Sequence, residues 1–214
     1  GTSIVVDMPS DGPDTPAVGD LLVALITVDG DHDDTLSAPQ GWTTIDLGMA
    51  YDNMATVGVY YRIVDGSEGT DFTFIWTGSE DVIGAIMWFT CADHQAVANW
   101  TVSASPNYWG YTADDGFNAI CPDTSSVDAD TLILRLFGSD RDVGRIPGAS
   151  HPSGHTGIFI ERTGAPNASA CSAGAAYTTQ LAAGSPGTAT FALWDDPNQG
   201  YVPDWRAYTL TIRS

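Results

Sequence analysis

Residues 72–91 read FTFIWTGSEDVIGAIMWFTC and contain two different strand patterns, one after the other. Over residues 72–77, aromatic residues alternate with threonine, with Ile75 as the exception. Alternation of this kind indicates a β-strand with one buried face. The following run, Val82–Cys91, is almost entirely apolar. It predicts a strand that is buried on both faces.

Working outward, further apolar runs of strand length recur along the chain, each bounded by turn residues. They are Ser3–Met8, Leu21–Val28, Trp42–Leu47, Ala55–Val64, Thr131–Phe137, His155–Arg162, Ala170–Leu181, Gly187–Leu193 and Trp205–Arg213. No longer window shows the 3.6-residue apolar stripe of an amphipathic helix. The pattern predicts an all-β protein, an antiparallel two-sheet β-sandwich of jelly-roll type with almost no helix.

The chain of 214 residues contains no Pro/Ser-rich linker and no repeat of fixed period. We therefore expect one domain over residues 1–214. The stretch 92–130 lacks a clear strand pattern and is longer than most connections in compact domains. We expect it to be an irregular excursion from the sandwich that carries surface chemistry.

The charge balance is strongly acidic. Seven Arg and no Lys stand against 24 Asp and three Glu, which gives a net charge of −20. Binding to nucleic acid phosphates or to anionic lipid needs clustered positive charge, so neither is expected. No apolar run approaches the ~20 residues of a membrane-spanning helix. High net charge also makes identical copies repel one another.

The chain has three cysteines, Cys91, Cys121 and Cys171, and an odd number cannot be fully paired within one chain. One disulfide with one thiol, or three thiols, are both open. No two of them have the Cys-x-x-Cys spacing of a zinc site. The favoured interpretation is buried, small apolar side chains.

Several of these segments together resemble a β-sandwich family that is common among the virion proteins of tailed phages. The resemblance covers most of residues 17–213, through its pattern over many segments and not through a single motif. The segments are Ala17–Ile26, Ala38–Ile45 with its Pro-x-Gly-Trp sequence, Val59–Gly69, Phe72–Ser79 with Val82–Ile86, Asp130–Gly138 and Trp205–Ile212. Residues 92–130 match poorly.

This resemblance implies a viral structural protein at the virion surface, in the extracellular medium, either a capsid decoration protein or a tail or fibre module. Other virion proteins are the expected partners, with formation of a homo-oligomer. The alternative is a carbohydrate-binding or adhesin module of a secreted protein. The resemblance implies no catalytic residues.

The residues themselves give no sign of an enzyme. The chain has no Gly-x-Ser-x-Gly elbow, phosphate-binding loop or dinucleotide fingerprint. Glycoside hydrolysis needs two suitably placed carboxyl groups, and with 24 Asp, chance pairings are common. We therefore expect no enzymatic activity and no required cofactor.

An acidic turn at residues 29–34 is the main candidate for a metal site. Asp29, Asp31 and Asp33 alternate as in loops that supply several hard oxygen ligands to calcium. An EF-hand would have Gly at its sixth position and an acid at its twelfth, where this chain has Asp34 and Gln40. A calcium site of another kind is one hypothesis, and a solvated turn between strands is the favoured one.

An aromatic cluster lies in the irregular stretch. Tyr108, Trp109 and Tyr111 are close in sequence, with Asp114 and Asp115 following. Aromatic faces beside polar groups suit a protein interface or the stacking of a surface glycan. The alternative is a loop that folds back over the end of the sandwich. These three aromatic residues are the candidates for contact with a partner or a glycan, and the loop cover is the favoured interpretation.

Overall fold

The computed structural model describes residues 1–12, 14–50, 55–90, 102–104, 118–124, 127–140, 149–163, 170–193 and 205–212. These residues form thirteen β-strands and no helix. The strands are β1 (Ser3–Asp7), β2 (Leu21–Asp29), β3 (Thr43–Met49), β4 (Ala55–Ile63), β5 (Asp71–Ile75), β6 (Val82–Phe89), β7 (Val102–Ala104), β8 (Asn118–Cys121), β9 (Thr131–Asp140), β10 (Thr156–Arg162), β11 (Cys171–Gln180), β12 (Ala189–Ala192) and β13 (Trp205–Ile212).

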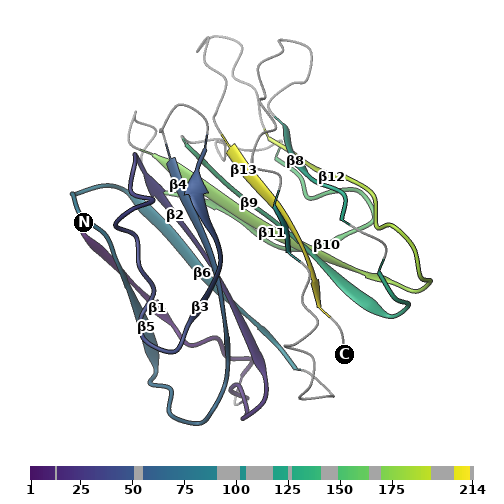
Figure 1. Ribbon diagram of the computed structural model, residues 1–214, viewed down its shortest axis with the longest axis horizontal. Coiled ribbons are helices and arrows are strands. Elements are labelled where there is room, and N and C mark those ends of the chain that lie inside the picture. The colour runs from purple at the N-terminus through teal and green to yellow at the C-terminus, as the bar shows by residue number, and fades with distance from the viewer. Residues whose placement is uncertain are drawn as a thin grey trace.

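Two antiparallel sheets face each other and form the sandwich (Figure 1). One sheet has the strand order β3-β4-β2-β6, and the other has the order β10-β11-β9-β13-β7. The strands of the first sheet lie within residues 21–89, and those of the second lie within residues 102–212. The predicted all-β, two-sheet antiparallel sandwich is therefore confirmed. The finer assignment to the jelly-roll type stays a prediction.

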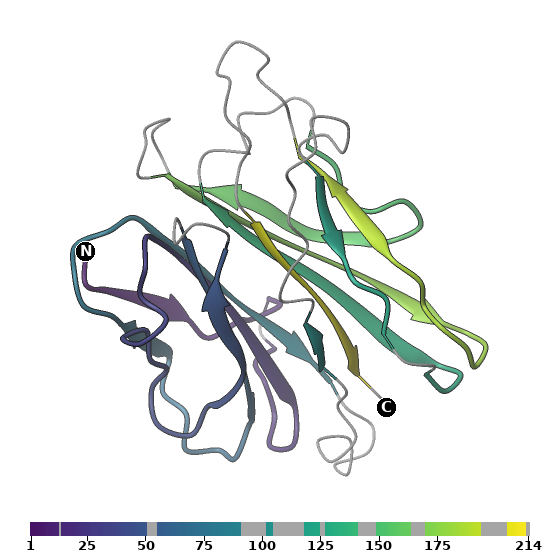
Figure 2. The same cartoon turned by 45° about the horizontal axis from the view of Figure 1, so that its top comes forward.

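A two-stranded ribbon lies outside each sheet, so that four layers are stacked (Figure 2). The β1–β5 ribbon covers the outer face of the first sheet, and the β8–β12 ribbon covers the outer face of the second. Both central sheets consequently have apolar side chains on both faces. This explains why β2 has eight consecutive buried residues, Leu21–Val28, without any alternation.

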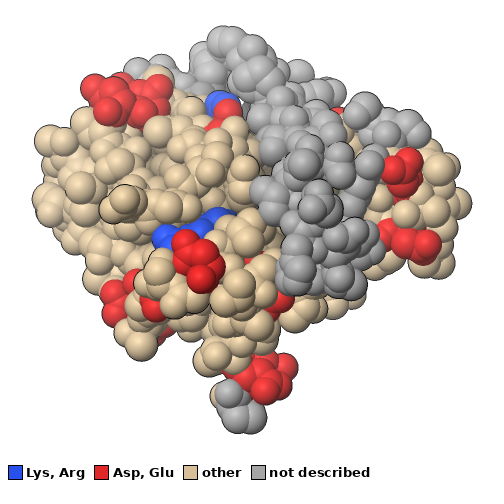
Figure 3. All heavy atoms as spheres, turned by 60° about the horizontal axis from the view of Figure 1, so that its bottom comes forward, with Lys and Arg blue, Asp and Glu red and all other residues tan. Residues whose placement is uncertain are grey.

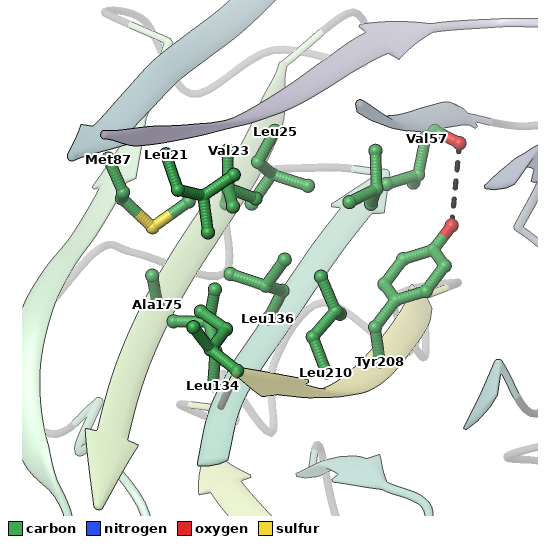
Figure 4. Packing of buried hydrophobic residues seen from close by; sticks show 13 residues of the cluster. Leu21, Val23, Leu25, Val57, Met87, Leu134, Leu136, Ala175, Tyr208 and Leu210 are labelled. Atoms are coloured by element: carbon green, nitrogen blue, oxygen red, sulfur yellow. Dashed lines mark hydrogen bonds between the residues drawn. The ribbon is translucent and has the colours of Figure 1, made fainter. Parts of the chain in front are cut away.

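The core between the two sheets is formed by apolar side chains from the facing strands (Figure 4). Its buried members are Leu21, Val23, Leu25, Val57, Val59, Met87, Leu134, Leu136, Ala173, Ala175, Tyr208, Leu210 and Ile212. One polar contact crosses this core, because the Tyr208 hydroxyl donates to the Val57 carbonyl oxygen over 3.4 Å. Burial also raises the pKa of Tyr208 well above its usual value, so the hydroxyl remains a donor.

The aromatic strand β5 follows the alternation expected from its sequence. Phe72 and Phe74 are buried on the inner side of the β1–β5 ribbon, and Ile75 is exposed. Trp42 packs edge-on against both phenylalanine rings, with ring centroids 5.0 and 5.7 Å apart. Trp42 therefore packs, partly buried, against the core under the β1–β5 ribbon.

Two sequence-based expectations need correction. The apolar strand β6 is only half-buried at most positions, because it lies at the edge of its sheet and pairs with β2 alone among the described strands. The stretch 92–130 is not wholly irregular, since it contributes β7 and β8. These strands have three and four residues, too few for a pattern of period two to be distinguished from chance.

The cysteine prediction is confirmed for two of the three residues. Cys121 and Cys171 are free thiols with no exposed surface. Burial raises the pKa of each to about 12, so neither forms a reactive thiolate near neutral pH. Cys91 lies outside the described residues.

A buried ion pair fixes the loop after β4. The guanidinium Nε of Arg62 donates to Glu68 Oε1 over 2.8 Å, and both side chains are more than nine-tenths buried. Arg62 also donates to the carbonyl oxygen of Gln40 over 2.9 Å. Gly41 has φ +90°, and a Cβ there would lie 2.2 Å from Arg62 Nη1. Position 41 therefore requires glycine for two reasons: the positive φ of the turn, and the space that the Arg62 guanidinium occupies.

Glu68→Gln is expected to lower the free energy of unfolding by roughly 2–3 kcal/mol, because it leaves the buried Arg62 guanidinium without its charged partner. Burial alone would raise the pKa of Glu68, but hydrogen bonds from the backbone N–H groups of Asp65, Glu68 and Gly66 and from Arg62 outweigh it and lower that pKa. A carboxyl with a lowered folded-state pKa contributes its stability above about pH 4.3, and loses it as the pH falls through the folded pKa.

Urea unfolding between pH 3 and pH 7 tests this expectation. The wild-type protein should lose stability over the acid part of the range more steeply than the Glu68→Gln variant. Parallel pH profiles for the two proteins would show that the ion pair contributes nothing to the acid dependence.

Candidate functional site

An apolar pocket lies beside the edge strand β6 and has a volume of about 560 Å³. We call it the β6 pocket. It is lined by Pro9, Ser10, Ile86, Met87, Trp88, Phe89, Thr90, Asp130, Leu132, Ile158, Tyr177 and Ile212. The volume is within the usual range of ligand pockets, about 300–1,000 Å³.

The strand registers explain why distant segments meet at this place. Phe89 at the end of β6 pairs with the first residue of β2, and Ile212 at the end of β13 pairs with Leu132 at the start of β9. Tyr177 near the end of β11 pairs with Thr156, the first residue of β10. The pocket therefore lies where these strand ends converge, as a continuation of the core between the sheets.

The pocket follows the edge of β6 and not one face of its sheet. Ile86 and Trp88 belong to the core under the β1–β5 ribbon, whereas Met87 and Phe89 belong to the core between the sheets. Side chains on both faces of β6 thus reach the same pocket. Both faces reach the pocket because β6 is apolar throughout and lies at the edge of its sheet. The apolar run Val82–Cys91 is the sequence signal that could have indicated this site.

The Trp88 side chain forms one wall of the pocket, and the buried carboxylate of Asp20 fixes its orientation. The indole Nε1 of Trp88 donates to Asp20 Oδ2 over 2.7 Å, and the backbone N–H of Ala17 donates to the same oxygen over 2.8 Å. Asp20 is only 8% exposed. The residue before it, Gly19, has φ +97°, which supplies the turn into β2. These contacts give the pocket a wall of fixed orientation.

Two irregular backbone features shape the opposite side. The register of β10 against β11 shifts between Gly157 and Phe159, so that Ile158 bulges out of the ladder and is 40% exposed. Asp130 is exposed and has φ +60°, a left-handed conformation that Asp tolerates better than most residues. The Thr131 hydroxyl, which donates to the Asp128 carbonyl oxygen over 2.9 Å, fixes this turn.

The lining is thus apolar inside and acidic at the rim. Aromatic and aliphatic side chains form most of the wall, and among the described lining residues Asp130 is the one with a carboxyl or amine group. Such a wall can exclude water from an apolar group, and the rim can attract a positive charge.

The positive side chains of the described chain are directed largely inward. Arg135, in the middle of β9, is 1% exposed and donates to the carbonyl oxygens of Pro122 and Gly187 over 3.0 and 2.8 Å. Arg206 on β13 crosses to Asp46 on β3 with contacts of 2.7 and 2.9 Å. Together with Arg62, these residues leave carboxylates as the main charge on the described surface, as the view in Figure 3 shows for one face.

The acidic turn at residues 29–34 is organised around a histidine. His32 is 8% exposed, and its backbone N–H donates to the Thr56 hydroxyl over 2.7 Å. Its Nε2 lies 4.0 Å from Glu80 Oε1. No group of three or more His, Cys, Asp or Glu side chains that could hold a metal ion is present within the described ranges. Asp29, Asp31 and Asp33 belong to these ranges, so the calcium hypothesis gains no support.

The three aromatic candidates for contact with a partner, Tyr108, Trp109 and Tyr111, lie outside the described residues. The prediction that they form an interface or a glycan contact stays a prediction.

Comparison of the chain with protein-family models, with curated proteins and with solved structures gave no match. Among the residues that the structure describes, no helix has the length and apolar character needed to cross a membrane.

Proposed function

We propose that this protein is a non-enzymatic structural protein of a tailed-virus particle, a capsid decoration protein or a tail or fibre module exposed at the virion surface. The observation that carries the proposal is the β6 pocket, an accessible apolar surface at one edge of the sandwich, in a chain whose charged residues are mainly carboxylates. A particle protein with net charge −20 must offset repulsion when it docks, and buried apolar area is one means of doing so.

The virion context rests on the resemblance to tailed-phage β-sandwich proteins. The residues that carry this resemblance have structural roles in the fold. Asp20 orients Trp88, and Gly41 admits Arg62. These roles support the proposal of a rigid building block. The expected partners are other virion proteins, with further copies of the same chain.

The buried charges support a structural role as well. Arg62, Arg135 and Arg206 bind backbone carbonyl oxygens and carboxylates that connect loops and strands. Each guanidinium group is thereby engaged in contacts that hold the fold. Contacts of this kind keep the surface of the protein in a fixed shape, which a protein that functions by docking to partners requires.

The test is whether the protein is a stoichiometric component of purified virus particles. Particles should be isolated from cells that express the chain together with its neighbouring genes, and their protein content quantified by mass spectrometry. We expect the chain to sediment with the particles after high-salt washing. Recovery only in the soluble fraction, at every salt concentration, would contradict the proposal.

A carbohydrate-binding or adhesin module is the second candidate, because Trp88, Phe89 and Tyr177 supply aromatic walls of the kind on which sugar rings stack. Glycan-array binding by the isolated protein, lost on replacing Tyr177 by Ala, would favour this candidate. The virion proposal expects no such binding at the β6 pocket.

A further inference from the structure

We infer that the β6 pocket takes an apolar side chain from an extended, basic segment of a different protein. This inference does not require that the chain be a virion protein. It follows from the shape of the pocket, the charge at its rim and the scarcity of positive charge in the sequence, which has no Lys and only seven Arg.

The shape favours an extended occupant. Residues 86–88 line the pocket consecutively, with Met87 directed to one face of the sheet and Ile86 and Trp88 to the other. A ligand that contacts all three must run along the edge of β6. Among the described strands, β6 pairs on one side only, with β2. An extended peptide can lie along such an edge and insert alternate side chains into adjacent apolar space.

The charge favours a basic occupant. Asp130 is exposed at the rim, and its neighbour Asp128 is exposed two residues away. On the opposite wall of the pocket, the lining residues Pro9 and Ser10 are followed in the sequence by two exposed acids, Asp11 and Asp14. A segment with Lys or Arg beside its apolar anchor would relieve the repulsion between these carboxylates.

A second copy of this chain cannot readily supply that segment. The chain has no Lys, and its 27 acids outnumber its seven Arg. Three of the four arginines in the described ranges, Arg62, Arg135 and Arg206, are engaged in the contacts given above. A second copy would therefore bring more carboxylates to an acidic rim, so the occupant is expected to be another protein.

The probe is a short synthetic peptide in which leucine alternates with threonine, with a lysine at each end. Its twin has glutamate in place of lysine. Isothermal titration calorimetry with the full chain at low salt should show binding of the lysine peptide, at least about tenfold tighter than that of the twin. Raising the salt to about 0.5 M should reduce the difference.

Two variants separate the apolar and the charged contributions. Ile158→Glu adds an acid beside the rim, so a purely electrostatic interaction would become tighter, whereas anchoring in an apolar pocket should weaken about tenfold. Asp130→Asn keeps a residue that accepts positive φ and should weaken lysine-peptide binding about threefold. Ile75→Glu and Asp31→Asn, exposed residues outside the pocket, are the matched controls and should change binding by less than a factor of two.

Four results would overturn the inference. They are absence of lysine-peptide binding at millimolar concentration, equal affinity for the twin, tighter binding by Ile158→Glu, and a self-associated wild type that Ile158→Glu dissociates. The last result would place a second copy in the pocket. None of them depends on whether the protein sediments with virus particles.

Discussion

Replacing Arg135 by methionine is expected to lower the free energy of unfolding by roughly 3–5 kcal/mol, at about 1–3 kcal/mol for each buried acceptor that loses its donor. The guanidinium donates to the carbonyl oxygens of Pro122, Pro186 and Gly187 and to the hydroxyl of Thr209. These acceptors belong to the ends of the β8–β12 ribbon and to β13. Methionine fills a similar space but removes the donor to the carbonyl oxygens of Pro186 and Gly187, whereas Pro122 keeps a hydrogen bond from the Thr209 hydroxyl. Burying a polar group that has lost its partner costs free energy.

Urea unfolding followed by tryptophan fluorescence measures this loss. Arg162→Met is the matched control, because Arg162 lies on the edge strand β10 and is half-buried, and its loss should be less than half as large. Burial itself lowers the pKa of Arg135, which shows that its desolvation is costly. Unchanged stability of Arg135→Met would mean that this cost cancels the contribution of the hydrogen bonds.

The second large effect is expected at Gly138, in the last third of β9, where the backbone faces side chains of the opposite sheet. A Cβ at this position would lie 2.3 Å from Thr27 Oγ1 and 2.8 Å from a methyl group of Val57. Both neighbours are fully buried on the facing sheet. Gly138→Ala should therefore lower the free energy of unfolding by about 2–3 kcal/mol, because the sheets must move apart to admit the methyl group.

Gly69→Ala is the control for this substitution, since Gly69 is exposed and the nearest atom to an added Cβ lies 3.8 Å away. Its effect on the free energy of unfolding should stay within about 0.5 kcal/mol. Equal effects of the two substitutions would show that the loss of glycine flexibility, and not the close approach of the sheets, governs stability at Gly138.

The local patterns of the sequence predicted the strands well. The alternation around Phe72 and Phe74 correctly identified a strand with one buried face, and every predicted strand run corresponds to a strand in the structure. The run Leu21–Val28 shows what such patterns omit. Its lack of alternation indicates burial on both faces, but only the structure reveals that a separate ribbon provides the second cover.

The candidate site was harder to predict. An uninterrupted apolar run indicates burial on both faces, yet β6 lies at the edge of its sheet and its side chains form the wall of a pocket. Strand order is decided by pairings between distant segments, such as Phe89 with Leu21, which a local pattern does not encode. The same holds for Arg135, whose partners come from three separate parts of the chain.

The central proposal is that this chain is a structural component of a tailed-virus particle. Cryo-electron microscopy of purified particles tests it most directly, by fitting the four-layered β-sandwich into the density map. The proposal predicts repeated density of this shape at the particle surface, with the β6 pocket facing a neighbouring protein. Particles without such density, together with a free monomer that binds glycans through the pocket, would contradict it.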